Sequence, residues 1–154
     1  MGLVPSGAAS SRVMASPELL WPVPKHWTME DAATVPLPYA LAFYCLAIKV
    51  RMLSKYSILV HGGTGALGQA VISIALAHGL QVFATVSDIR KKHFLMKLFP
   101  ELREDHIGNS RDASFKDMVH TRTKGLGVTY VINCIKSDLR DISISCVAPS
   151  GALI

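Results

Sequence analysis

The residues best suited to chemistry in this sequence are three glycines spaced as G-x-G-x-x-G. They lie in the run Gly63-Thr64-Gly65-Ala66-Leu67-Gly68, between an apolar run and an apolar helical pattern. In this strand-to-helix context such glycines bind a pyrophosphate. We expect Gly63 to form the tight turn, Gly65 to leave room for the phosphates and Gly68 to let the helix pack closely. The alternative is a glycine-rich turn that binds nothing.

The end of the next apolar run determines which dinucleotide would fit. It reads Val86-Ser87-Asp88-Ile89-Arg90-Lys91-Lys92. Ser87 occupies the position where a carboxylate would bind the ribose 2′-hydroxyl of NAD, and Asp88 follows one residue later. The adjacent cations Arg90, Lys91 and Lys92 suit a 2′-phosphate, so we expect NADPH. Two alternatives stay open, namely a solvated basic helix start and Asp88 as a helix N-cap without a ligand role.

Four side chains could donate a proton, but each has a structural alternative. His61 ends a predicted strand and is expected to be packed and hydrogen-bonded, and Tyr44 is expected in the core. Tyr39 lies near the start of a predicted helix, and Lys136 is expected to be solvated. The sequence therefore assigns no catalytic residue.

The cysteines do not suggest a metal site. Cys45, Cys134 and Cys146 are far apart and have no CxxC spacing. Neither a disulfide framework nor a zinc site is expected, and we interpret all three as small apolar core residues.

The elements that must position these residues begin after a proline-rich start. Residues 1–25 contain four prolines and many small residues, which favours extended segments and turns. Thr28 and Asp31 form a predicted capping box, so a short helix should run from Met29 until Pro36 and Pro38 break it. A second helix is predicted over 39–50, with an apolar stripe made of Leu41, Tyr44, Cys45 and Ile48.

Strands and helices alternate from residue 57 onward, which predicts an α/β fold with a Rossmann-type doubly wound parallel sheet. The first helix should follow the glycine turn, run for about twelve residues and end at Gly79. The other predicted elements are helices over 90–98, 114–123 and 138–147, and strands over 57–61, 81–86, 106–107, 128–135 and 151–154.

Composition narrows the classes of protein. The chain has 154 residues, of which 50% are hydrophobic and 18% charged, so one folded unit is expected and disorder is excluded. No apolar run is expected to be long enough to span a membrane, and no secretory signal is recognised, so we expect a cytoplasmic protein without a membrane partner. The net charge is +5, but the basic residues form one tight cluster without interleaved aromatics, so no nucleic-acid partner is expected.

Four segments resemble the enoyl reductase region of animal fatty acid synthase, most closely the insect form, a zinc-free part of the medium-chain dehydrogenase/reductase superfamily. The segments are WPVPKHWTMEDAATVPLPYALAFYCL, SILVHGGTGALGQAVISIALAHGLQVFATVSD, KLFPELREDHIGNSRDASF and GLGVTYVINC.

The resemblance implies NADPH-dependent reduction of a carrier-bound trans-2-enoyl thioester in fatty acid biosynthesis. Lys91 matches the family lysine that contacts the NADPH 2′-phosphate, and Lys92 matches a neighbouring basic position. Arg111 falls where the family places groups near the ribose phosphate, although it could instead cap a helix or pair with Asp112. Asn133 lies where cofactor and strand ends meet, or forms a turn.

The resemblance also predicts the domain organisation. Residues 1–52 would be a remnant of the substrate (GroES-like) domain with linking helices, and residues 53–154 a partial NADP(H)-binding domain truncated before its last strand. The family turn often reads GGVG where this chain has GALG, and the family's proposed proton donors would lie beyond Ile154. The chain would then be a fragment of a larger synthase whose parent is a homodimer.

Two other functions compete with this interpretation. One is a stand-alone, zinc-free quinone-type oxidoreductase, which shares the glycine turn. The other is a non-catalytic protein that binds NADPH without reducing anything.

Overall fold

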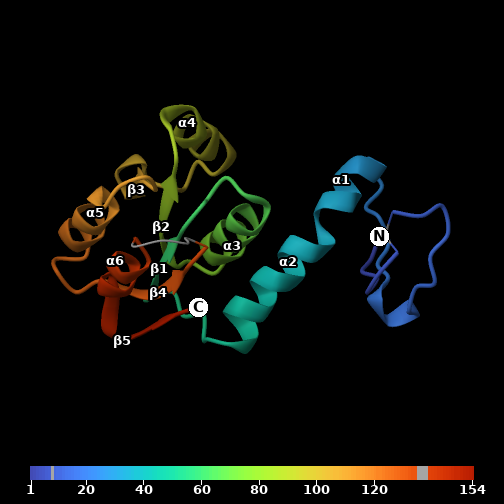
Figure 1. Ribbon diagram of the computed structural model, residues 1–154, viewed down its shortest axis with the longest axis horizontal. Helices are drawn as coiled ribbons and strands as arrows, with labels where there is room; N and C mark the ends of the chain where they lie inside the picture. The colour runs from blue at the N-terminus through green and yellow to red at the C-terminus, as the bar shows by residue number, and fades with distance from the viewer. Residues whose placement is uncertain (8, 135–138) are drawn as a thin grey trace.

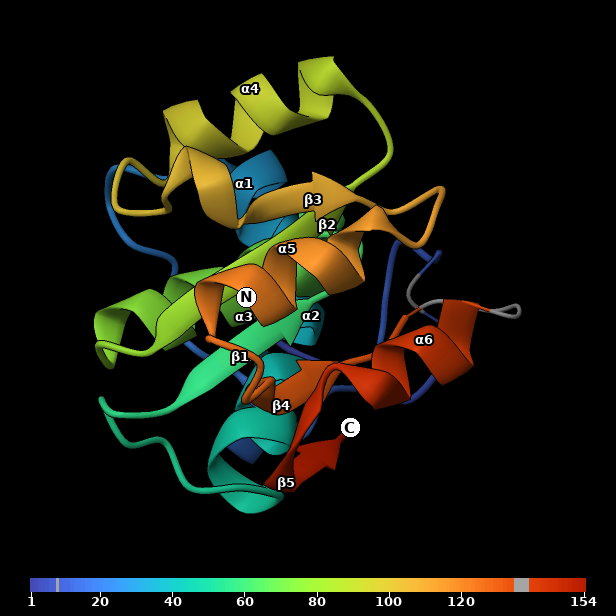
Figure 2. The same ribbon diagram turned by 90° about the vertical axis from the view of Figure 1, so that its left-hand side faces the viewer.

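In the part of the chain that the computed structural model describes, residues 1–7, 9–134 and 139–154, five strands form one parallel sheet. The strand order is β3-β2-β1-β4-β5 (Figures 1 and 2). Successive strands are added on one side of β1 up to β3 and on its other side from β4, so the strand order reverses between β1 and β4. The strands are β1 (Ser57–Val60), β2 (Gln81–Val86), β3 (Ile107–Asn109), β4 (Val128–Ile132) and β5 (Val147–Leu153). This is the Rossmann-type order, so the predicted fold class is confirmed.

Helices cover both faces of the sheet because the inner strands are apolar on both sides. α3 (Ala66–Ala77) and α4 (Ile89–Leu98) pack on one face, and α5 (Ser114–Arg122) and α6 (Leu139–Ser145) pack on the other. Neighbouring residues of β1 alternate between the two cores, with Ile58 in the first and Leu59 in the second. A short 3₁₀ turn, η3 (Glu104–His106), leads into β3.

A helical arm precedes the sheet and reaches away from it toward the N-terminus (Figure 1). It consists of α1 (Met29–Thr34), α2 (Pro36–Phe43) and η2 (Tyr44–Ile48), and a 3₁₀ turn η1 (Pro17–Leu19) lies before it. The capping box predicted at Thr28 and Asp31 is present in both directions.

The prediction that the first helix ends before Pro36 is confirmed, since α1 ends at Thr34, but Pro38 lies inside α2, so the second helix begins at Pro36 and not at Tyr39. Val35 keeps helical angles, and α2 begins at Pro36, where the missing N–H costs nothing because a first-turn N–H has no partner inside the helix. The arm is therefore one stretch, Met29–Ile48, of 20 residues, apolar enough by length and composition to cross a membrane and 28% buried. This corrects the expectation that no such run exists.

The apolar stripe predicted on this arm is also placed on the wrong face. Leu41, Tyr44 and Ile48 are 44%, 45% and 64% exposed, so Tyr44 is not a core residue. Ala42 and Leu46 are buried instead and belong to the core under α3. The sequence periodicity fits both faces because nearly every residue of the arm is apolar.

Other differences concern the end of the chain. β5 begins at Val147, four residues earlier than predicted, and β4 ends at Ile132, three residues before the predicted end. Of the cysteines expected in the core, Cys146 is buried, Cys45 is partly buried and Cys134 is exposed. Lys136 lies outside the described residues.

Candidate functional site

The glycine turn joins the end of β1 to the N-terminus of α3, at the carboxyl edge of the sheet. The Gly63 N–H donates to the Thr85 carbonyl at 3.0 Å, which ties the turn to β2. The Gly65 N–H donates to the Gly62 carbonyl at 2.8 Å. Gly65 is the N-cap of α3 and no side chain caps this helix, so its first N–H groups and its dipole are directed at the edge where an anion would lie.

One glycine of the turn serves a different purpose from that predicted. Gly62 has the positive φ, +66°, so it and not Gly63 supplies the left-handed turn. A Cβ on Gly63 would lie 2.9 Å from Leu95 Cδ1 and 3.2 Å from Ile72 Cδ1, so Gly63 packs closely against two buried side-chain ends. A Cβ on Gly68 would lie 2.8 Å from the Gly63 Cα, in agreement with the predicted close approach of helix and turn. Among the three glycines of the G-x-G-x-x-G motif Gly65 is the most open, since a Cβ on it would meet only the Gly62 carbonyl oxygen, at 3.2 Å.

His61 fixes the strand end beside this turn. It is 1% exposed, its Nδ1 lies 2.9 Å from Thr85 Oγ1, and its Nε2 lies 2.9 Å from Ser143 Oγ. Because Ser143 donates its proton to the Leu139 carbonyl, His61 must donate from Nε2 and accept at Nδ1. Burial lowers the pKa of His61 to about 4, so the ring is neutral near pH 7. It is a packed, hydrogen-bonded histidine, as expected.

The end of β2 carries a chain of polar contacts. Lys91 Nζ donates to Ser87 Oγ at 2.7 Å, and Ser87 Oγ donates to Asp88 Oδ2 at 3.0 Å. Asp88 Oδ1 accepts the Lys91 N–H at 3.0 Å, so Asp88 is the N-cap of α4, and this bond is the main cause of its lowered pKa. Asp88 therefore caps α4 as the alternative expected, and each of its carboxylate oxygens accepts a hydrogen bond.

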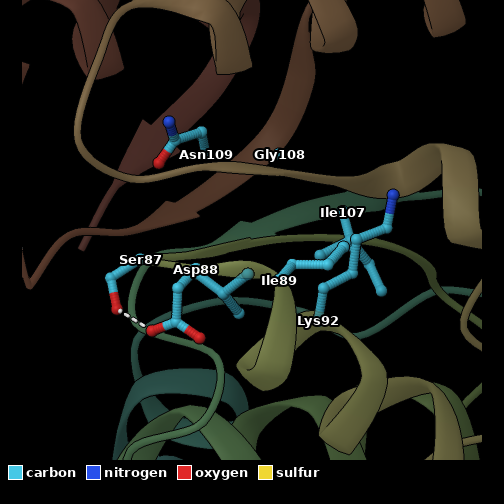
Figure 3. A pocket seen from close by; sticks show the side chains of 8 residues that line it. Ser87, Asp88, Ile89, Lys92, Ile107, Gly108 and Asn109 are labelled. Carbon is cyan, nitrogen blue, oxygen red and sulfur yellow. Dashed lines mark hydrogen bonds between the residues drawn. The ribbon is translucent and has the colours of Figure 1, made fainter.

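A cleft of about 240 Å³ lies between this strand end and β3 (Figure 3). Its lining residues are Val86, Ser87, Asp88, Ile89, Lys92, Ile107, Gly108 and Asn109. Lys92 contributes its side chain to the wall, but its Nζ lies 3.3 Å from Glu104 Oε1, so its charge is paired. Sequence reasoning missed the β3 residues, although the position of Asn109 beside Arg111 in the same motif could have indicated them.

The remaining candidate residues do not line this cleft. Tyr39 lines a separate cavity of about 620 Å³ together with Ala66 and Gln69, next to the start of α3. The Asn133 N–H donates to the Ile154 carbonyl at 3.0 Å just beyond β4. Arg111 is exposed in the loop after β3.

Comparison with known proteins identifies the family. The family described as zinc-binding dehydrogenase matches residues 66–154. The chain therefore belongs to the zinc-binding dehydrogenase family. Within the described residues no group of three or more His, Cys, Asp or Glu side chains could hold a metal ion, so these residues do not fit a zinc centre.

The similar curated proteins are large synthases. A highly reducing polyketide synthase of Cladosporium cladosporioides is 37% identical over 145 residues, covering 94% of this chain and 6% of that protein. The lovastatin diketide synthase of Aspergillus terreus is 35% identical over 149 residues, covering 97% of this chain and 6% of that protein. The chain thus spans about 6% of the length of these relatives, which are fungal polyketide synthases and not the animal fatty acid synthases expected from the sequence.

The similar solved structures include enoyl reductases. The CurK enoyl reductase has a TM-score of 0.80 at 33% identity, covering 90% of this chain and 40% of that one. A mycobacterial protein complexed with NADPH has a TM-score of 0.78 at 28% identity, covering 90% of this chain and 42% of that one. These neighbours agree with the predicted fold and with the prediction of NADPH as the cofactor.

Proposed function

We propose that this chain binds NADPH and forms the nucleotide-binding part of an enoyl reductase within a multidomain synthase. One observation carries the proposal: the uncapped N-terminus of α3 lies beside the glycine turn, with the Ser87 and Lys91 pair at the end of the neighbouring strand. A pyrophosphate and a 2′-phosphate need these two kinds of group at one edge of a sheet.

Each part of the edge has a distinct role in this proposal. The first-turn N–H groups of Ala66, Leu67 and Gly68 bind the pyrophosphate, and the open space at Gly65 lets it approach the backbone. Lys91 and Ser87 bind the 2′-phosphate, the lysine through its charge and the serine through its hydroxyl. Asp88 serves in this proposal as the N-cap of α4, and its oxygens accept bonds from Ser87 and Lys91.

The proposed reaction is the reduction of a carrier-bound trans-2-enoyl thioester. NADPH, when bound, supplies a hydride to the β carbon, and a proton reaches the α carbon. The described residues bind and orient the nucleotide, and we assign no proton donor among them. The cavity beside Tyr39 adjoins the start of α3, but no contact in it singles out an acid.

The parent protein is part of the same proposal. Similarity to polyketide synthases over nearly the whole chain supports a multidomain synthase with a carrier-bound substrate. The narrower assignment to an animal fatty acid synthase rests on the sequence motifs alone, as do a homodimeric parent and a cytoplasmic location. The coding sequence that flanks this segment tests the class of synthase, and a stand-alone quinone-type reductase would have no flanking synthase domains.

One face of the helical arm supports a further lobe of the reductase, although Ala42 and Leu46 on the other face pack into the core under α3. Leu37, Leu41, Tyr44 and Ile48 follow the spacing i, i+4, i+7 and i+11, and each is at least 44% exposed. An apolar face of this length is normally covered by another part of a protein. We propose that residues 1–52 belong to the substrate-binding lobe of the reductase and that the rest of that lobe covers this face.

The test of nucleotide binding is calorimetric titration of the chain with NADPH and with NADH, for the unsubstituted protein and for Lys91→Ala. We expect NADPH to bind more tightly than NADH, and Lys91→Ala to weaken NADPH binding by about tenfold because one charge-assisted contact is lost. NADH affinity should not change.

Lys97→Ala is the matched control. Lys97 is exposed in the last turn of the same helix, and its substitution removes the same charge. It should leave the preference for NADPH unchanged. Folded protein that binds neither nucleotide would contradict the proposal.

A further inference from the structure

A cavity of about 370 Å³ is formed by the helical arm and the segment before it, and we call it the apolar cavity. Its lining residues include Trp21, Val35, Pro36, Tyr39, Ala40 and Phe43. The three aromatic side chains are partly open to solvent, with Tyr39 39%, Trp21 42% and Phe43 56% exposed. Among the described residues that line this cavity, no side chain carries a charge. A concave, uncharged and aromatic wall of this size is typical of a site for an apolar ligand.

Backbone hydrogen bonds fix Trp21 beside the arm. Gly2 and Leu20 form an antiparallel bridge, and the Trp21 N–H donates to the Met1 carbonyl at 2.7 Å. A Cβ on Gly2 would overlap the Leu19 carbonyl oxygen, so the two segments approach as closely as a glycine allows. The backbone therefore holds Trp21 in place, although its indole ring is not buried.

A second cavity joins the apolar cavity to the start of α3. Val35 and Tyr39 line both the apolar cavity and the larger cavity of about 620 Å³. The larger cavity also has the polar side chains of Gln69 and Ser73, and it reaches Ala66, the first residue of α3. The proposed pyrophosphate would lie at this helix N-terminus. A ligand with a polar end and an apolar chain therefore fits the two cavities in one direction, with its polar end toward α3.

We infer that the apolar cavity binds the acyl chain of the thioester substrate. This inference rests on the proposed function and adds to it the place of the chain. Burial of methylene groups stabilises the bound chain, whereas the thioester end stays in the larger, more polar cavity. Tyr39 lies at the boundary between the two, and Ala40 and Phe43 limit the length of chain that the apolar cavity accepts.

The experiment titrates the full chain, with NADPH present, with pantetheine thioesters and measures binding by calorimetry. The probes are the saturated butyryl and octanoyl thioesters, which have no double bond to reduce, and free octanoate. We expect the octanoyl thioester to bind at least about tenfold more tightly than the butyryl thioester, because more methylene groups leave water. Octanoate should bind more weakly than the octanoyl thioester, because the described residues that line the two cavities offer its carboxylate no cation.

Ala40→Phe tests the position of the chain, because the added ring occupies the apolar cavity. It should remove the gain from butyryl to octanoyl. Ala47→Phe is the matched control, since Ala47 is exposed on the same arm and does not line the apolar cavity, and it should keep the gain. If Ala40→Phe does not fold, as judged by its melting curve, Phe43→Ala removes an exposed aromatic wall and should weaken octanoyl binding by about fivefold.

Trp21 provides a second readout of the same site. The chain has two tryptophans, so Trp27→Phe leaves Trp21 as its single fluorescent indole. The octanoyl thioester should shift its emission to shorter wavelength, because the bound chain displaces water from the ring. Ala40→Phe should abolish this shift, and Ala47→Phe should preserve it.

Three outcomes overturn the inference. They are equal affinities for the butyryl and octanoyl thioesters, a gain that persists in Ala40→Phe, and octanoate binding as tight as that of the octanoyl thioester, which would assign the cavity to free fatty acids. A chain that binds NADPH and gives any of these results overturns the inference alone. A folded chain that binds neither NADPH nor NADH overturns the proposed function, and the inference with it.

Discussion

The two strand ends that form the candidate site are built in opposite ways. At the end of β1 the turn is internal, with His61 1% exposed and Gly63 and Gly68 packed against neighbouring atoms. At the end of β2 the polar groups are external, with the Lys91 and Asp88 side chains 50% and 41% exposed. In the proposed complex the first region would bind the nucleotide through its backbone, and the second through its side chains.

Because of this difference, substitutions in the two regions should affect different properties of the protein. Changes at the turn disturb packing and should reduce the stability of the whole sheet. Changes at the end of β2 alter charges in solvent, so they should change nucleotide preference and leave the fold intact.

The largest effect is expected from Gly68→Ala. Its Cβ would overlap the Gly62 carbonyl and lie 2.8 Å from the Gly63 Cα, both of them backbone atoms. Neither can move without opening the turn, so we expect the free energy of unfolding to fall by about 2–4 kcal/mol. Urea denaturation of the two proteins measures the difference.

Gly65→Ala provides the control within the same turn. Its Cβ meets only the Gly62 carbonyl, at 3.2 Å, so the stability loss should stay below about 1 kcal/mol. Nucleotide binding should fall instead, because the methyl group occupies the approach to the backbone. Similar stability losses for the two variants would contradict the distinction between a packed and an open glycine.

The next largest effect is the pH dependence of the free energy of unfolding that arises from His61. Its pKa is about 4 in the folded chain, against an ordinary value of 6.5. Above pH 6.5 the ring is neutral in both states. As the pH falls from 6.5 to 4 the unfolded chain takes up the proton first, so stability should be lost over this window, by at most about 3 kcal/mol.

The measurement is the free energy of unfolding at pH 7 and pH 4.5 for the unsubstituted chain and for His61→Gln. His61→Gln should be less stable at pH 7 and should lose less stability on acidification, because this titration is removed. An equal loss in both proteins would assign the acid sensitivity to other groups, among them His106, whose pKa burial also lowers.

Local sequence signals predicted the sheet and the turn well, for a physical reason. Apolar strands buried on both faces, the capping box at Thr28 and the glycine spacing each depend on a few neighbouring residues. The role of Gly63 was not predictable in this way, because Leu95 and Ile72, whose side-chain ends pack closely against it, come from other elements.

The helical arm shows where sequence reasoning fails. Its residues are apolar on nearly all sides, so periodicity could not tell that Ala42 and Leu46 pack under α3 while Leu41 and Tyr44 stay exposed. The hydrogen bond from Asn109 to Asp112 was also not predicted, because it depends on β3 ending at Asn109.

The smallest effect is expected from Asp88→Asn, which separates the role of Asp88 as the cap of α4 from the role of its negative charge. Asp88→Asn keeps a side-chain oxygen that can accept the Lys91 N–H, so the cap of α4 and the melting temperature should be nearly unchanged. It also removes a negative charge beside the proposed 2′-phosphate site. We therefore expect NADPH to bind about two- to threefold more tightly, with NADH unaffected.

Asp88→Ala removes both the charge and the cap, so it should show the same gain in NADPH affinity with a melting temperature lower by about 2–4 °C. Paired calorimetric titrations and thermal melts of the two variants separate the contributions. If Asp88→Asn instead weakened both nucleotides equally, Asp88 would bind a ribose hydroxyl common to the two. The end of β2 would then recognise the nucleotide through the carboxylate that caps α4, and not through Lys91 alone.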